Sequence, residues 1–422
     1  MRSALASLCV LLFSGVATAQ SGFVELRASW QVGVEGKAWQ LVERFRPRFT
    51  AELDERWAIF SELEVSLQQG RRLESELRRT LEASELGPIL ESAGYVWPED
   101  ENETLGVSRL EDYLEVSRLY LDWYHPDFDL RVGRQSIYWG SAAFLNPTDP
   151  FPELLIAEPW RPRRGMNAAR LNLPLSERAD LTLVTGSNDS FKALRAASRL
   201  RATFGEADFS LVAAYRGDDK DGLIGLDLRG TYGVGYWIES ALWSTDWKTF
   251  DLAIGFDYSI HGIFEGIIVM GQFLYNGRGI KDVAGLTLPA SSPISELDAT
   301  TSVEGDAMPT FGPILRGRYY AMGSMTLALS LDLSLGITKL MNLEDRTGFV
   351  VPNLSYRASD WLELFLTAQI PWQLSEEGGE FYPSDESMTV VVPLGGDGTG
   401  PEVDLSGLRP DASVTLWCRM SY

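Results

Sequence analysis

Arginines recur at spacings of two and four residues in three stretches of the chain. Side chains two residues apart lie on the same face of a β-strand, so each stretch would present several guanidinium groups to one side. A guanidinium keeps its charge and carries a planar fork of donors, which suits carboxylates and hydroxyl groups. The spacing therefore predicts a surface that guides an anionic or hydroxylated solute. The arginines are Arg44, Arg46 and Arg48; Arg195, Arg199 and Arg201; and Arg316 and Arg318.

Acidic residues share the predicted strand faces with these arginines. Two interpretations remain open at this level. The acids pair with the arginines and neutralise them, or enough arginines stay available to form a charged constriction. The acids are Glu62, Glu64, Asp251, Asp257 and Asp332.

The elements that must position these charges have a period of two. From Met325 to Ile337, and again from Phe250 to Ile260, apolar residues alternate with small or polar ones. This pattern predicts strands with one apolar and one polar face. In a soluble β-protein the apolar face would form the core, whereas in a membrane barrel it faces lipid and the polar face lines the lumen.

The N-terminus favours the membrane barrel. Arg2, an apolar stretch over 5–13 and the sequence Ala17-Thr18-Ala19 are the three parts of a secretory signal peptide, so we expect residues 1–19 to be removed. No later uncharged apolar run approaches the roughly 18 residues of a transmembrane helix. The net charge of −22 argues against a nucleic-acid partner. The chain is thus predicted to be exported and to meet the membrane through strands.

The C-terminal residues support the same class. Apolar and polar residues alternate from Ser413 to the terminal aromatic residue Tyr422, which resembles the last strand by which bacterial outer-membrane barrels are recognised for insertion. The barrel-assembly machinery, outer-membrane lipid and lipopolysaccharide are therefore expected partners. Localisation in the outer membrane follows.

Strand and loop lengths predict an all-β, transmembrane antiparallel barrel over residues 20–422, with about 18 strands. Two of the predicted strands, 312–322 and 325–337, are separated by a turn near Gly323. Periplasmic turns are short. Long extracellular loops are predicted near 70–111, 139–164, 277–311 and 371–410.

One long loop carries a distinctive motif. Gly133-Arg134-Gln135 and Trp139-Gly140 precede Asn146-Pro147-Thr148-Asp149-Pro150-Phe151, and proline ends strand pairing because it lacks an N–H donor. We expect this loop to fold into the barrel and narrow it, with Asn146 and Asp149 capping its turns. Its candidate constriction residues are Trp139, Asn146, Asp149, Phe151, Trp160, Arg161, Arg163 and Arg164.

The motif resembles the alginate-export-like outer-membrane porins and related uncharacterised barrels. The resemblance implies an 18-stranded pore with an arginine-lined selectivity site, and some members of the group pass anionic polysaccharide outward. It also implies that Arg134 lies on the pore wall and that the Asn146–Phe151 stretch anchors the loop. The alternative is a structural ion pair between Arg134 and Asp149 that holds the loop in place.

No catalytic site, cofactor or metal site is predicted. The two histidines, His125 and His261, each lie beside a predicted periplasmic turn, where a solvated turn residue is the ordinary interpretation. Two function classes remain. One is a channel for a hydrophilic solute, which extends to the outer conduit of exopolysaccharide export with periplasmic secretion components as partners. The other is a largely plugged barrel that acts as a receptor, adhesin or assembly scaffold.

Overall fold

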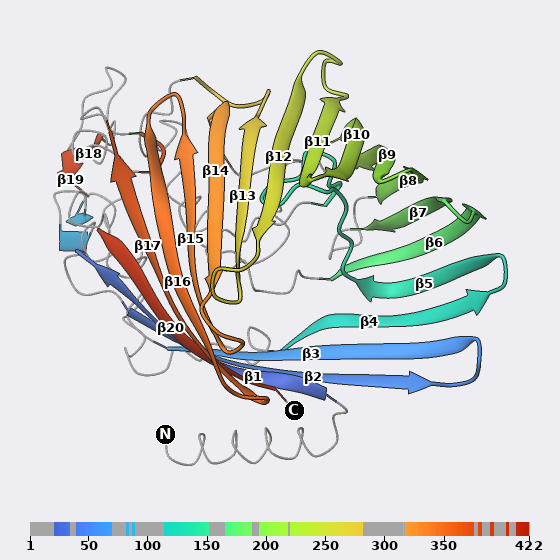
Figure 1. The fold of residues 1–422 in the computed structure, drawn as a ribbon, viewed down its shortest axis with the longest axis horizontal. Helices are drawn as coiled ribbons and strands as arrows, with labels where there is room; N and C mark the ends of the chain where they lie inside the picture. The colour runs from blue at the N-terminus through green and yellow to red at the C-terminus, as the bar shows by residue number, and fades with distance from the viewer. Residues whose placement is uncertain are drawn as a thin grey trace.

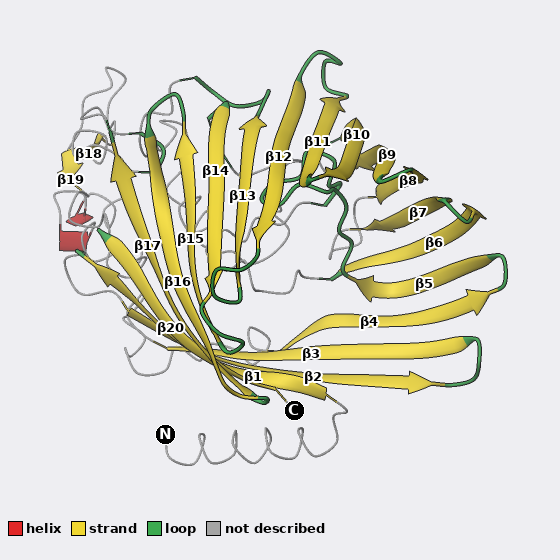
Figure 2. Cartoon of the chain, viewed as in Figure 1, coloured by secondary structure: helices red, strands yellow, loops and turns green. Residues whose placement is uncertain are grey.

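The chain forms a barrel of 18 antiparallel strands, each following its predecessor around the wall (Figure 1). The computed structural model describes residues 21–33, 39–69, 82–83, 87–88, 114–151, 165–187, 194–217, 220–281, 315, 317–374, 379–381, 389–391, 402–404 and 411–421. Almost all of the described chain is strand or short turn (Figure 2).

The barrel strands fall into three runs along the chain. The first comprises β1 (Ser21–Val32), β2 (Trp39–Glu52), β3 (Trp57–Gln69), β4 (Leu114–His125), β5 (Phe128–Gln135) and β6 (Met166–Ser176). The second comprises β7 (Ala179–Ser187), β8 (Leu194–Phe204), β9 (Ala207–Arg216), β10 (Asp221–Tyr232), β11 (Val234–Trp243) and β12 (Phe250–Ile260). The third comprises β13 (Gly266–Tyr275), β14 (Tyr319–Ala328), β15 (Leu333–Asn342), β16 (Thr347–Ser359), β17 (Leu362–Gln373) and β20 (Ala412–Ser421). A separate two-stranded sheet pairs β18 (Thr389–Val391) with β19 (Glu402–Asp404).

The first and last strands close the sheet. β1 pairs with β2 on one side and with β20 on the other, and Glu25 lies opposite both Arg44 and Arg419. Closure leaves no unpaired strand edge, which is what a β-structure needs in order to cross hydrocarbon. The predicted fold class, an all-β antiparallel barrel of about 18 strands, is confirmed.

The two faces of the wall differ as the alternation predicts. On β12, Ile254, Phe256 and Tyr258 are exposed on one face, while Asp251 and Ala253 are buried on the other. Large apolar side chains recur on the outer face of most strands, which suits contact with lipid. Within the residues that the structure describes, no helix is both long and apolar enough to cross a membrane.

One hairpin differs from the prediction. The run from Met325 to Ile337 is not one strand, because a turn at 329–332 divides it between β14 and β15. Leu327 lies opposite Leu335, so odd-numbered residues stay on the outer face through the turn and the alternation hides the break. The predicted turn near Gly323 is therefore wrong, and Gly323 lies within β14.

The position of this turn corrects one predicted inward charge. Asp332 lies in the turn and is exposed, where its N–H donates to the Ser330 hydroxyl at 3.2 Å. Arg318 directly precedes β14, where its side chain donates to the Gly279 carbonyl at 3.0 Å, and its place on the pore wall stays a prediction. Arg316 lies outside the described residues.

The turn can be tested by cysteine labelling in a Cys418→Ser background. Leu331 is 81% exposed at the turn, whereas Leu335 belongs to the lipid-facing side of β15. We expect Leu331→Cys to react rapidly with a charged maleimide in lipid vesicles open to the reagent on both sides, because a turn lies in water. Leu335→Cys should react at least about tenfold more slowly, since hydrocarbon excludes the charged reagent. Equal rates at the two positions would contradict the hairpin.

Candidate functional site: the inner wall of the barrel

The motif-bearing loop lies against one face of the wall. Residues 136–151, called the inner segment below, contact side chains from strands β6 to β16. A single short segment can reach so many strands of a closed sheet only from its concave side. The face carrying these side chains is therefore the inner wall.

The inner segment rests on two apolar clusters. Ile137 and Trp139 pack against Val184, Val212 and Trp243, together with other residues of strands β6–β11. Further along, Ala142 and Leu145 pack in a second cluster that includes Trp237, Leu274 and Tyr320. Burial of these apolar groups holds the segment on the wall.

Polar contacts fix the segment between the two clusters. The Glu239 carboxylate accepts hydrogen bonds from the N–H groups of Ser141 and Ala142, both at 2.5 Å, and from the hydroxyl of Thr148 at 2.9 Å. The side chain of Gln272 accepts from the Phe144 N–H at 3.2 Å and donates to the Leu145 carbonyl at 3.0 Å. The backbone of a loop inside the barrel thus finds its partners on the wall.

Asn146 and Asp149 cap turns within the segment. The Asn146 amide donates to the Trp139 carbonyl at 3.1 Å, and the Asp149 carboxylate accepts from the Phe151 N–H at 3.2 Å. Trp139, Asn146, Asp149 and Phe151 are therefore brought together at the inner wall, and their narrowing of the pore stays a prediction. Trp160, Arg161, Arg163 and Arg164 lie outside the described residues.

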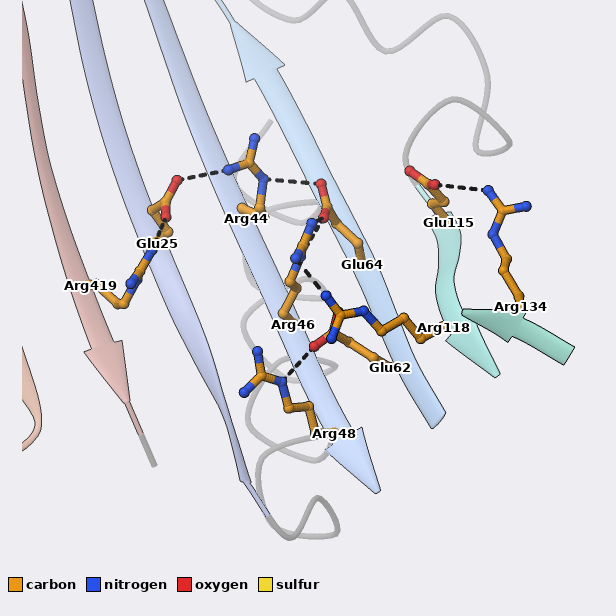
Figure 3. A network of polar contacts seen from close by, with 10 residues as sticks. All are labelled: Glu25, Arg44, Arg46, Arg48, Glu62, Glu64, Glu115, Arg118, Arg134 and Arg419. Atoms are coloured by element: carbon orange, nitrogen blue, oxygen red, sulfur yellow. Dashed lines mark hydrogen bonds and ion pairs between the residues drawn. The ribbon is translucent and has the colours of Figure 1, made fainter. Parts of the chain in front are cut away.

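The first arginine group forms a buried ion-pair network on strands β20, β1, β2, β3 and β4 (Figure 3). Arg44 contacts Glu25 at 2.8 Å and Glu64 at 3.0 Å. Arg46 contacts Glu64 and, at 3.6 Å, Glu62. The outlying members of the network are Arg48 and Arg118, which contact Glu62 at 2.5 and 3.9 Å, and Arg419, which contacts Glu25 at 3.4 Å.

This network decides how its arginines behave. Arg46 is 1% exposed and Glu62 is fully buried. Their charges are matched by near neighbours, which is the pairing alternative that the sequence left open. Of the arginines that β2 and β4 contribute to the network, Arg44 and Arg46 are buried, whereas Arg48 and Arg118 lie at its margin and are partly exposed.

A second arginine group covers the inner wall of strands β5–β10. Arg131 forms an ion pair with Asp122 at 2.6 Å, and Arg170 lies directly opposite Arg131. Arg199 lies over the Trp139 ring, 5.3 Å from its centroid, which joins this group to the inner segment. The remaining members are Arg195, which is buried; Arg201, which pairs with Asp180 at 2.8 Å; and Arg229, which pairs with Asp257 at 3.0 Å.

Sequence reasoning missed several residues of the inner wall. Arg131 alternates with Leu130 and Val132, and Arg170 with Ala169 and Leu171, so the strand period itself could have placed both inward. The contact between Glu239 and the inner segment could not be predicted in this way, because its partners lie up to 98 residues earlier in the chain. Arg134, which was predicted, pairs with Glu115 at 3.3 Å. No group of metal-binding side chains is found in the part of the chain that the structure describes.

Comparisons with known proteins identify the fold. No protein-family model matches the chain, and no curated protein matches it in sequence. Among solved structures, the chain resembles Wzi from Escherichia coli, described as a carbohydrate-binding β-barrel of the outer membrane involved in group 1 capsule assembly. That match has a TM-score of 0.52 at 9% identity and covers 98% of this chain and 87% of Wzi.

Two barrels from Pseudomonas aeruginosa are similar to a comparable degree. OccK5 (OpdH) matches with a TM-score of 0.52 at 9% identity, over 95% of this chain and 97% of that chain. The outer membrane protein opdK matches with a TM-score of 0.51 at 8% identity, over 95% and 98%. The chain therefore has the fold of a bacterial outer-membrane β-barrel.

The buried network predicts a large stability effect for Arg46. Replacing Arg46 by Met should lower the free energy of unfolding by about 3 to 5 kcal/mol, because it leaves Glu62 and Glu64 with less compensating charge. The matched control is Arg357→Met, since Arg357 and Glu363 form an exposed pair at 4.0 Å worth about 0 to 1 kcal/mol. Urea unfolding of the barrel refolded into lipid vesicles measures both. Similar losses for the two variants would contradict the structural role of the network.

Proposed function

We propose that the chain is an outer-membrane channel whose inner wall selects a hydrophilic solute that is anionic or rich in hydroxyl groups. The observation that carries the proposal is the arginine group on strands β5–β10. Arg131 and Arg170 are directly opposite each other, and like charges in that position repel. An anion between them would relieve this repulsion.

Some of these arginines have no acidic residue directly opposite them on the neighbouring strands. Arg170 lies between Arg131 and Val184, and Arg199 between Thr182 and Val212, so neither has an acid directly opposite. The side chains of Arg201 and Arg229 are each 49% exposed although both have acidic partners. A concentration of positive charge on a wall of low dielectric raises the local concentration of anions. This wall contrasts with the network around Arg46, where every arginine lies within 3.9 Å of a glutamate.

A narrower proposal concerns exopolysaccharide. The Gly133–Gln135 and Asn146–Phe151 motif resembles that of the alginate-export-like porins, and Wzi, which shares the fold, is described as carbohydrate-binding. Both support a conduit for an acidic polysaccharide, with periplasmic secretion components as partners. Export with removal of residues 1–19, contact with lipopolysaccharide and the absence of catalysis belong to the same proposal.

A plugged barrel is the second candidate, and the packing of the inner segment favours it. Strands β6 to β16 all contribute side chains to the two apolar clusters in which the segment packs. A segment held so extensively occupies part of the lumen. Such a barrel would act as a receptor, adhesin or scaffold at the cell surface.

Reversal potentials in planar bilayers under a salt gradient test the channel. The intact mature chain should conduct with a preference for chloride over potassium. The triple variant Arg170→Gln, Arg199→Gln, Arg201→Gln should lower that preference at least about twofold, because it removes positive potential from the path. The control is Arg178→Gln, which changes an exposed arginine in the turn between β6 and β7. An unchanged reversal potential in the triple variant would rule out selection by this arginine group.

Deleting residues 141–162 separates the two candidates. Conductance only after deletion would favour the plugged barrel with the inner segment as its plug. Silence of both the intact and the deleted chain, in preparations that show the heat-modifiable migration of a folded barrel, would reject the channel.

A further inference from the structure

The structure assigns to Glu239 a role as the positioning residue that holds the inner segment and thereby sets the width of the lumen. This inference rests on the proposed channel function and deepens it. Glu239 lies on β11 with its side chain on the inner wall, where it is fully buried. No sequence motif singled it out.

Four donors of the inner segment converge on this one carboxylate. Oε1 accepts from the N–H groups of Ser141 and Ala142, and Oε2 accepts from the N–H of Thr148 at 3.3 Å and from its hydroxyl at 2.9 Å. Both oxygens of the side chain act as acceptors, and each holds a different part of the segment. Both ends of the stretch from Ser141 to Thr148 are therefore fixed to one point of the wall.

A second acidic residue of the wall, Asp227, also contacts the inner segment. Asp227 of β10 lies directly opposite Glu239, an arrangement that is repulsive for two acids. The Ser141 hydroxyl donates to Asp227 at 2.9 Å, and Arg229 donates to the Ser141 carbonyl at 3.1 Å. The inner segment thus donates a hydrogen bond to each of two acids that lie opposite each other on adjacent strands.

The position of Glu239 along β11 also matters. Its neighbours on the same face are Trp237, which belongs to the cluster around Leu145, and, beyond Ala241, Trp243, which belongs to the cluster around Trp139. Glu239 therefore lies between the two apolar clusters. If it were lost, each half of the segment would keep its own apolar contacts, but the four hydrogen bonds that tie Ser141, Ala142 and Thr148 to one point of the wall would be gone.

Gly140 provides the space that this contact needs. Its φ of +97° is a conformation that other residues rarely adopt, and a Cβ there would lie 2.9 Å from the Glu239 carboxylate and 2.7 Å from Asn146. The chain thus turns toward Glu239 at the one residue type that permits both the angle and the close approach. The adjacent N–H groups of Ser141 and Ala142 then point at the carboxylate.

The decisive variant is Glu239→Gln, studied in the full mature chain. A glutamine can accept from one pair of donors, but its NH₂ group then faces the other pair, so about half of the contacts are lost. Hydrogen exchange followed by mass spectrometry should show that the Ser141 and Ala142 amides, or that of Thr148, exchange about tenfold faster than in the unaltered chain. Unitary conductance in bilayers should change in the same variant.

Two further variants keep the test sharp. Glu206→Gln removes the same charge from an exposed turn between β8 and β9, away from the inner wall, and should alter neither exchange of the segment nor conductance. Thr148→Val removes one donor while keeping the shape of the side chain, and should give an intermediate effect. It also serves as the test if the Glu239 variant does not fold.

The outcomes distinguish this inference from the channel proposal. Faster exchange together with altered conductance, both confined to the Glu239 and Thr148 variants, supports it. Unchanged exchange, or faster exchange with the conductance of the unaltered chain, overturns the positioning role. Faster exchange in a protein that conducts in none of its forms rejects the channel but retains Glu239 as the anchor of the segment.

Discussion

Backbone pairing between β1 and β20 is the constraint on which the rest of this structure depends. Once the sheet closes, each strand has two hydrogen-bonded neighbours, and alternate side chains face either hydrocarbon or a confined interior. The outer face then follows directly from the sequence, because it needs only apolar side chains. The inner face is more demanding, since each polar group placed there must find a partner or remain in contact with water.

The inner wall meets this demand in different ways around its circumference. Near the closure, guanidinium and carboxylate groups on adjacent strands match one another, as in the contacts of Arg44 with Glu25 and Glu64. Along β10 and β11, the acids Asp227 and Glu239 are matched instead by a segment from another part of the chain. Between these regions, the arginines of β5–β8 have fewer acids opposite them. The same architecture thus contains a region of ion pairs, a region that holds a loop and a region of less fully paired arginines, to which the channel proposal assigns the solute.

The sequence predicted the fold well because period-two alternation is a local property. The alternation from Phe250 to Ile260, for example, predicted a strand, and β12 spans the same residues. The β14–β15 hairpin was not predicted. Leu327 lies opposite Leu335, so apolar residues stay on the same face on both sides of the turn, and the alternation in the sequence continues without a break. For the site, strand parity correctly oriented Arg44, Arg46 and Arg199, but it could not show which arginines find acids. That depends on register between strands and on the path of the inner segment, both of which are long-range properties.

The ion pairs at the closure also bear on how the barrel selects its register. Glu25 lies opposite Arg419, and Arg27 lies opposite Trp417. A slip of two residues between β1 and β20 would preserve which residues face lipid, so the hydrophobic pattern alone cannot reject it. In one direction, however, the slip would bring Arg27 opposite Arg419 and remove Glu25 from its partner; in the other, it would set Glu25 against Trp417. The charges of Glu25, Arg27 and Arg419 therefore favour the observed register when β1 pairs with β20. High salt screens these charges and should increase the fraction of barrels that close in a shifted register.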